Sequence, residues 1–239
     1  KGYYDIIDLL LSKIKVDASV SNNCCIKSAC QIGCIKSVRL LLQHQKVNPG
    51  DNYNEALVLA SKNGNVDILY LLLNNYKINP EISFNNAVYG AIRYGKINSV
   101  KVLLDDPRAE SKFFNKSIIG FASRFGNHSI VKLLLDYNIF DPGFKNDYAI
   151  RIASMKGFSK IVKLLLEHEN VNPATNNNYP IRVASKNGHS EVVPLLLRDK
   201  RVDPSADNYY ALRISKKIGH MMIINLLLED RRVGFYVLE

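Results

Sequence analysis

Cysteine is scarce in this sequence, and long apolar runs are absent. All four cysteines, Cys24, Cys25, Cys30 and Cys34, fall within eleven residues of a 239-residue chain, so no disulfide framework is expected. Their spacing also lacks the paired C-x-x-C of common structural zinc sites. The apolar runs are too short to cross a bilayer, and no basic start followed by an apolar core marks a secretory signal. We expect a soluble, intracellular protein of the cytoplasm or nucleus.

Motifs for catalysis and cofactor binding are missing as well. The sequence has no glycine-rich phosphate loop, no helical metal-ligand motif and no nucleophile elbow. His44, His128 and His168 have no cysteine or carboxylate partner that repeats with them. His44 and His168 fall at the end of predicted helices, where imidazole more often caps than binds metal. We therefore predict that the protein is not an enzyme and has no cofactor, metal or small-molecule substrate.

The sequence consists instead of an internal repeat of 31 residues without insertion or deletion. A glycine marks each step, with an alanine four residues before it and a leucine-rich triplet seven to nine residues after it. The glycines are Gly2, Gly33, Gly64, Gly95, Gly126, Gly157, Gly188 and Gly219. A fixed period between about 20 and 50 residues is typical of solenoids, in which each unit buries its apolar face against its neighbours.

Each repeat carries the helical hydrophobic period twice. Ala149, Ile150 and Ala153 recur at three- and four-residue intervals, and a wider apolar face follows Gly157 at residues 161–166. We predict two short antiparallel helices per repeat, with the glycine in a left-handed conformation between them. Neither helix is long enough to be stable alone, so packing between repeats must supply most of the stability.

Polar residues predict where the helices begin. Asn and Asp at 146–147 and 177–178 are expected to cap the first helix of their repeats, and Ser159 and Ser190 the second. Pro194 falls inside a second helix, where it is expected to remove at most about one hydrogen bond and to bend that turn. Valine-Asn-Pro segments such as 171–173 are expected to be extended.

The predicted domain organisation is one array over residues 1–239. It has a partial first repeat at 1–16, seven further helix pairs over 22–233, and a divergent end at 234–239. Because the chain begins inside a repeat and without methionine, we expect it to be a piece of a longer protein.

These residues resemble ankyrin repeats. The family pattern T-P-L-H-x-A, then G-H, then V-V-x-L-L-L can be matched to YPIRVAS at 179–185, to Gly188-His189 and to VVPLLL at 192–197. Tyrosine replaces threonine, arginine replaces histidine at Arg151, Arg182 and Arg213, and the period is 31 rather than 33. We expect these arginines to have a structural role, in which the guanidinium bridges backbone carbonyls of adjacent repeats. This variant resembles arrays of amoebae and large DNA viruses. The resemblance implies an all-α solenoid of stacked helix-turn-helix units with short extended fingers, and a monomeric scaffold for protein–protein interaction.

The resemblance also implies a binding face. In ankyrin arrays the residues two before the glycine project from the concave side. Here this position reads Gln31, Lys62, Arg93, Arg124, Met155, Lys186 and Lys217. Its five cations, which we call the cation row, are Lys62, Arg93, Arg124, Lys186 and Lys217. They are either solvated surface charges or a site for an acidic protein partner.

Aromatic residues mark the least regular repeat. Ser111 replaces the proline there, Phe113 and Phe114 fall in the finger, and Phe144 occupies the register of Phe113 one repeat later. They are either anchors for a partner or a local repacking around the missing proline.

Two other functions stay open. The net charge of +10 favours weak nonspecific contact with nucleic acid, but no nucleic-acid-binding motif is present and no specific nucleic-acid site is expected. The array is alternatively the substrate-recruiting part of an adaptor in a ubiquitin-ligase or host-manipulation system, with the effector segment outside this sequence. No membrane partner is expected.

Overall fold

The computed structural model describes residues 5, 9–10, 16–109 and 114–234, and in these residues it contains helices and no strands. The first helices of successive repeats are α2 (Val20–Ile32), α4 (Asp51–Asn63), α6 (Pro80–Arg93), α8 (Ile118–Arg124), α10 (Phe144–Lys156), α12 (Thr175–Lys186) and α14 (Ala206–Ile218). The second helices are α3 (Ile35–Gln43), α5 (Val66–Leu73), α7 (Ile97–Leu104), α9 (His128–Asp136), α11 (Ser159–Leu166), α13 (Val193–Arg198) and α15 (Met221–Glu229), and the short α16 (Arg231–Gly234) follows. The predicted all-α fold is confirmed. Most of the predicted partial repeat at 1–16, and residues 235–239, lie outside the described residues.

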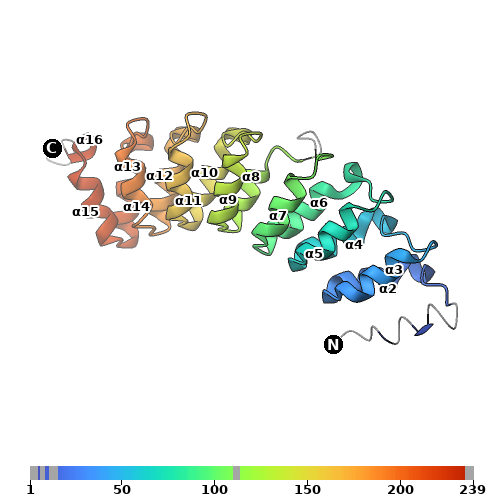
Figure 1. Cartoon of the computed structure of the whole chain (residues 1–239). Coiled ribbons are helices and arrows are strands. Elements are labelled where there is room, and N and C mark those ends of the chain that lie inside the picture. The colour runs from blue at the N-terminus through green and yellow to red at the C-terminus, as the bar shows by residue number, and fades with distance from the viewer. Residues whose placement is uncertain (1–4, 6–8, 11–15, 110–113, 235–239) are drawn as a thin grey trace. The chain divides into compact units, whose positions relative to one another are not determined.

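The helices belong to two compact units, residues 1–115 and residues 116–239. In unit 1 the first helices α2, α4 and α6 pack in sequence, and the second helices α3, α5 and α7 form a parallel layer (Figure 1). Unit 2 repeats this arrangement with α8, α10, α12 and α14 in one layer and α9, α11, α13 and α15 in the other. Each unit is therefore a two-layer stack of helix pairs.

Small residues allow the first helices to approach closely. The repeating alanines Ala60, Ala91, Ala122, Ala153 and Ala184 are completely buried. Ser61 and Ser123, which follow two of these alanines, are also buried, and their hydroxyls donate to the carbonyl four residues earlier in the helix. Larger side chains of the second helices, among them Leu72, Leu103 and Leu134, fill the space between the layers. The residues at the repeating apolar positions of the sequence thus form the core.

A left-handed turn begins most first helices, which the sequence analysis did not predict. Three successive residues have φ between 50° and 61° at 21–23, 52–54, 145–147, 176–178 and 207–209. The predicted N-caps Asn146-Asp147 and Asn177-Asn178 lie in these turns, so the capping prediction was wrong; Gly143 and Ala174 precede α10 and α12 instead. L-residues pay about 1–2 kcal/mol each in this conformation, and Asn and Asp tolerate it best, which explains the composition of the segment.

The last residue of the left-handed turn connects its repeat to the next. The side-chain oxygen of Asn23 accepts from the backbone N–H of Asn48 at 2.8 Å, that of Asp147 from Asn172 at 2.7 Å, and that of Asn178 from Asp203 at 2.7 Å. We call this contact the inter-repeat clamp. Asn54 makes a variant of it, in which its amide donates to the carbonyl of Asn79 and to Ser83.

The clamp side chains are buried, with exposed fractions of 8% or less at Asn23, Asn54, Asp147 and Asn178. A buried backbone N–H without a partner costs about 1–3 kcal/mol. The clamp gives the backbone N–H at the start of the next finger an acceptor in a partly buried contact, so it offsets part of the cost of the left-handed turn.

Two second helices do not begin as predicted. Ser159 is the first residue of α11, and its hydroxyl contacts Glu191 instead of capping the helix. Ser190 lies in a turn, and α13 starts only at Val193, with Pro194 at its second position. A proline there has no helical donor to lose, so Pro194 shortens the helix from its start and does not bend its interior.

The glycine between the helices has positive φ, as predicted, at Gly33, Gly64, Gly95, Gly126, Gly157, Gly188 and Gly219. Two of these positions differ in their surroundings. A Cβ on Gly157 would lie 2.5 Å from Nδ1 of His189, whereas a Cβ on Gly219 would meet no atom within 4 Å.

Gly157→Ala is therefore expected to destabilise the protein more than Gly219→Ala. Both variants place an alanine in the left-handed conformation, which costs about 1–2 kcal/mol. Only Gly157→Ala also displaces His189 from the carbonyl of Met155. Urea unfolding of the two variants measures the difference. An equal loss of unfolding free energy in both would show that the contact with His189 adds nothing.

The inter-repeat clamp predicts a loss of about 1–3 kcal/mol in unfolding free energy for Asn178→Ala. Asn177→Ala is the matched control, because Asn177 has the same left-handed φ but an exposed side chain. Asn178→Asp keeps the accepting oxygen, as Asp147 does naturally, and is expected to stay near the wild type. Equal losses for the two alanine variants would contradict the clamp.

Candidate protein-interaction surface

In unit 1 the cation row contributes two exposed or partly exposed residues from neighbouring first helices, Lys62 on α4 and Arg93 on α6. Both approach the same aromatic ring. Nζ of Lys62 lies 4.9 Å from the ring centre of Tyr94, and the guanidinium carbon of Arg93 lies 6.0 Å from it. Cations over a tyrosine face are attracted by its quadrupole, so Tyr94 groups two positive charges on this face of unit 1.

In unit 2 the cation row lies beside two shallow pockets on the first-helix layer. The first, about 190 Å³, is lined by Tyr179, Arg182, Val183, Lys186 and Tyr210. The second, about 200 Å³, is lined by Tyr210, Arg213, Ile214 and Lys217. Tyr210 belongs to both. Aromatic and cationic side chains alternate here, a composition typical of protein interfaces.

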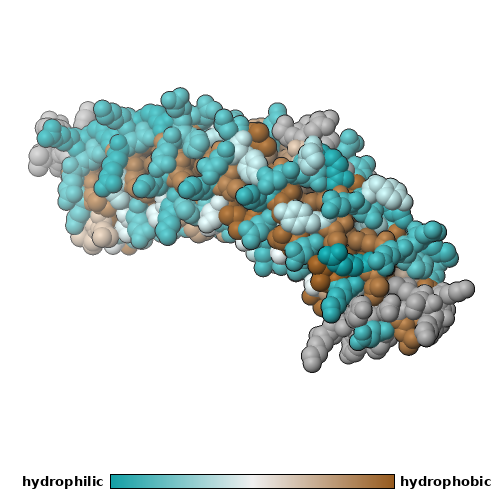
Figure 2. All heavy atoms as spheres, in the orientation of Figure 1, coloured by the Kyte–Doolittle hydropathy of each residue, from teal (hydrophilic) through white to brown (hydrophobic). Residues whose placement is uncertain are grey.

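The remaining members of the predicted row are less alike. Arg124 on α8 is exposed, and Met155 on α10 is partly buried. Unit 2 thus carries three cations of the cation row, Arg124, Lys186 and Lys217, with one apolar side chain in the same register between them. Over unit 2, Figure 2 shows hydrophilic side chains in rows with hydrophobic atoms between them.

Arg151, Arg182 and Arg213 were expected to bridge carbonyls of adjacent repeats, and the structure corrects this. Their guanidinium groups donate to carbonyls of their own repeat's left-handed turn: Arg151 to Asn146 at 2.7 Å, Arg182 to Asn176 at 3.3 Å and Arg213 to Asp207 at 3.3 Å. Only Arg182 also reaches the next repeat, through an ion pair with Asp207, and it stacks 5.4 Å from the ring centre of Tyr210. These arginines therefore stabilise the turn and shape the pockets together.

The predicted aromatic anchors differ in exposure. Phe114 is buried, with 5% of its surface exposed, which favours a packing role for it. Phe144 starts α10 and is partly buried. Phe113 lies outside the described residues. Sequence reasoning missed Tyr179 and Tyr210, although tyrosine at 148, 179 and 210 recurs at the period of the repeat and was the available signal.

The histidines of the Gly-His position have the structural role expected of them. Nε2 of His189 donates to the carbonyl of Met155 at 2.9 Å, and Nε2 of His220 contacts the carbonyl of Lys186 at 3.3 Å. Each imidazole thus connects its repeat to the end of the preceding first helix.

The cysteines do not form a common site. Cys30 is completely buried, and burial raises the pKa of its thiol to about 12. Cys25 is exposed, in contrast to the buried Ala56 and Ala149 at its register. Among the described residues, no three His, Cys, Asp or Glu side chains are grouped as a metal would require.

Stacked helix pairs joined by a left-handed glycine, with a regular exposed row on the first helices, define a helical repeat protein of the kind built for surface recognition. The comparisons agree. A family model for ankyrin repeats, in three-copy form, matches residues 1–83, 26–115, 87–177 and 119–208. The chain belongs to the ankyrin-repeat family.

Among solved structures, the chain is similar to the ankyrin repeat domain of human ASB11. The two are 19% identical with a TM-score of 0.61, and the match covers 80% of this chain and 96% of that one. A comparison with curated proteins gave no match. In the part of the chain that the structure describes, no helix has the length and apolarity needed to span a membrane.

The surface residues and the structural arginines are expected to respond differently to substitution. Lys186→Ser and Lys217→Ser should each change the unfolding free energy by less than about 0.5 kcal/mol, because both side chains are exposed. Arg182→Ala should cost about 1 kcal/mol, through the lost contacts with Asn176 and Asp207. Urea unfolding checks both. A large loss for Lys186→Ser would mean that the cation row is structural.

Proposed function

We propose that this protein is a scaffold that binds an acidic protein partner through the first-helix face, with the cation row as its charged contacts. Ankyrin repeats are generally protein–protein interaction modules. The observation that carries the proposal is the pair of pockets in unit 2, where Lys186 and Lys217 stand beside Tyr210. No residue of the chain is proposed to be catalytic.

Charge and composition favour an acidic partner. Lysine and arginine on one face raise the rate at which an opposite charge approaches. Tyrosine supplies rigid contact area with a polar end, which is why it is frequent in interface cores. Tyr210 lies between two of the cations, so a partner carboxylate and an apolar side chain would both find contacts within one short stretch of α14.

A charge-matched capture experiment tests the proposal. The chain is immobilised and exposed to an extract of its native cell, beside a variant with the five residues of the cation row changed to serine. The control variant has five exposed lysines elsewhere changed to serine: Lys101, Lys132, Lys160 and Lys163 on second helices, and Lys200 after α13. Both variants lose the same net charge.

The expected result is a defined protein that the wild type and the control variant retain and the cation-row variant loses. Its binding should weaken with rising salt, because exposed charges are screened. Equal capture by all three chains would overturn the proposed face. Loss in both variants would show that net charge alone, and no particular surface, is responsible.

A narrower hypothesis makes this array the substrate-recruiting part of a ubiquitin-ligase or host-manipulation adaptor. It requires an effector segment outside the present sequence, and the sequence of the full-length protein would decide it.

A further inference from the structure

A basic side chain occurs where several of the fingers begin, and in the last two repeats it is an arginine that reaches back to the preceding repeat. In unit 2, Arg201 donates to the carbonyls of Val171 at 2.7 Å and Leu166 at 3.4 Å. Arg232 donates in the same way to Val202 at 2.6 Å and Leu197 at 2.7 Å. In both cases the acceptors precede the arginine by 30 and 35 residues. We call this contact the arginine bridge.

A carboxylate completes each arginine bridge. Asp199 and Asp230, two residues before their arginines, bind the guanidinium through both oxygens. Hydrogen bonds from Arg201 hold the pKa of Asp199 below its ordinary value, and hydrogen bonds to Asp230 raise the pKa of Arg232. The more distant charge of Asp203, 29 residues before Arg232, acts in the same direction. The position is thus suited to a planar cation.

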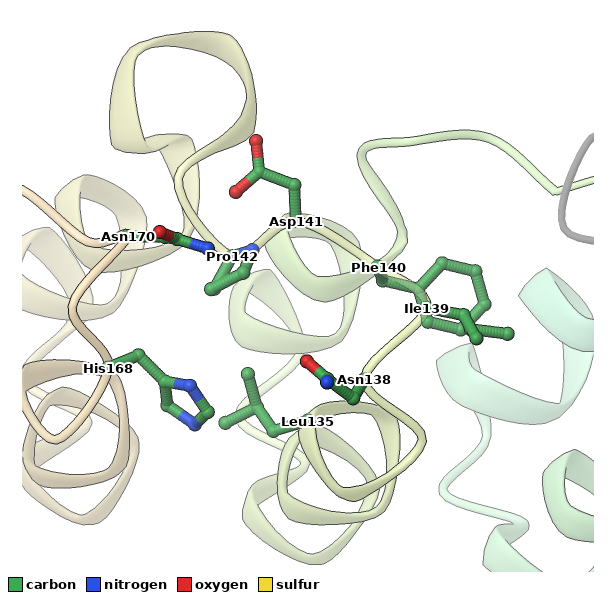
Figure 3. A pocket seen from close by; sticks show the side chains of 8 residues that line it. All are labelled: Leu135, Asn138, Ile139, Phe140, Asp141, Pro142, His168 and Asn170. Carbon is green, nitrogen blue, oxygen red and sulfur yellow. The ribbon is translucent and has the colours of Figure 1, made fainter.

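Asn170 occupies this register in the repeat before that of Arg201, and its side chain is too short to make the bridge. A pocket of about 220 Å³, lined mostly by polar atoms, lies there instead, and we call it the Asn170 pocket (Figure 3). Its lining includes Leu135, Asn138, Phe140, Asp141, His168 and Asn170. His168 and Leu135 point toward one another on one side, and Asp141 and Pro142 lie on another.

The lining of the Asn170 pocket repeats the two carbonyl positions of the arginine bridge, but not its bound carboxylate. Phe140 and Leu135 precede Asn170 by 30 and 35 residues, the same steps that separate Val171 and Leu166 from Arg201. A carbonyl oxygen has two lone pairs, so these positions have acceptor capacity for a further donor. Asp141 precedes Asn170 by 29 residues, as Asp203 precedes Arg232. His168 stands where the two following repeats have Asp199 and Asp230, the carboxylates that bind the arginines. Asp141 is therefore the carboxylate of this lining, in the register from which Asp203 acts on Arg232 by charge.

We propose that the Asn170 pocket binds the guanidinium of an arginine side chain carried by a protein partner. The chain itself shows the mode of binding, because Arg201 and Arg232 occupy the same position in the two following repeats. A guanidinium presents several donors in one plane and can reach two carbonyls and a carboxylate together. The inference rests on the proposed function, since it assigns one contact of a partner, but it concerns a different surface from the cation row.

Small probes test the pocket without any partner. Blocked arginine, N-acetyl-arginine N-methylamide, is titrated into the labelled chain at constant ionic strength, and the amide resonances of Leu135, Asn138, Phe140 and Asn170 are followed. The comparator is the blocked citrulline, which has the same shape but no charge. Saturable shifts are expected for the arginine probe, and binding of citrulline should be at least about tenfold weaker.

Three variants localise the binding. Asn170→Arg places a guanidinium of the chain itself in the pocket, so it is expected to abolish the probe-induced shifts and to raise the melting temperature. Asn170→Gln cannot form the arginine bridge and should keep the probe-induced shifts. Asp141→Asn retains the oxygen that accepts from Gly143, as Asn172 does toward Ala174, and should weaken binding several-fold with the fold intact.

Equal affinity for arginine and citrulline, or undiminished shifts in Asn170→Arg, would overturn the proposal. Neither result bears on the cation row, because that surface is tested by capture of a protein and this one by a small molecule. The two proposals can therefore fail independently.

Discussion

The stacking of the repeats depends on how the backbone N–H at the start of a finger finds an acceptor in the preceding repeat. The inter-repeat clamp provides the acceptor from Asn23, Asp147 or Asn178. It can do so only because the chain first makes a left-handed turn, which aims the side chain at the next repeat. Where it occurs, that turn sets the start of the first helix, and hence which residues of the helix face solvent.

Much of the fold followed from the sequence. The glycine, alanine and leucine registers predicted helix pairs and a left-handed break, because periodicity of burial is a local property of the chain. The left-handed turn did not follow. Asparagine-rich segments such as 176–178 favour N-caps and left-handed residues alike. The choice between the two depends on the backbone N–H of Asp203, which lies 25 residues after Asn178 and donates to its side chain. Pro194 was misread for a related reason, since the sequence did not show where α13 begins.

Part of the candidate surface could be predicted from the sequence. The cation row was found because its position relative to the glycine is fixed by the repeat. Tyr179 and Tyr210 were visible in the sequence but had no assigned role until the pockets of unit 2 placed them beside Lys186 and Lys217. The Asn170 pocket could not be found from sequence, because a side chain that is too short is significant only when compared with the contacts that Arg201 and Arg232 make.

The clamp also bears on how such a protein diverges. Its donor at Asn48, Asn172 and Asp203 is a backbone N–H, which every residue except proline possesses. The clamp itself therefore does not depend on the side chains at those positions, which instead accept hydrogen bonds from Gly50, Ala174 and Ser205 two residues later. A proline follows each of them directly, at Pro49, Pro173 and Pro204, so a shift of the pairing by one residue would place a proline where the donor is required. A single-residue insertion that shifts the pairing in this direction would therefore break the clamp, whereas adding or removing a whole repeat would leave its register unchanged.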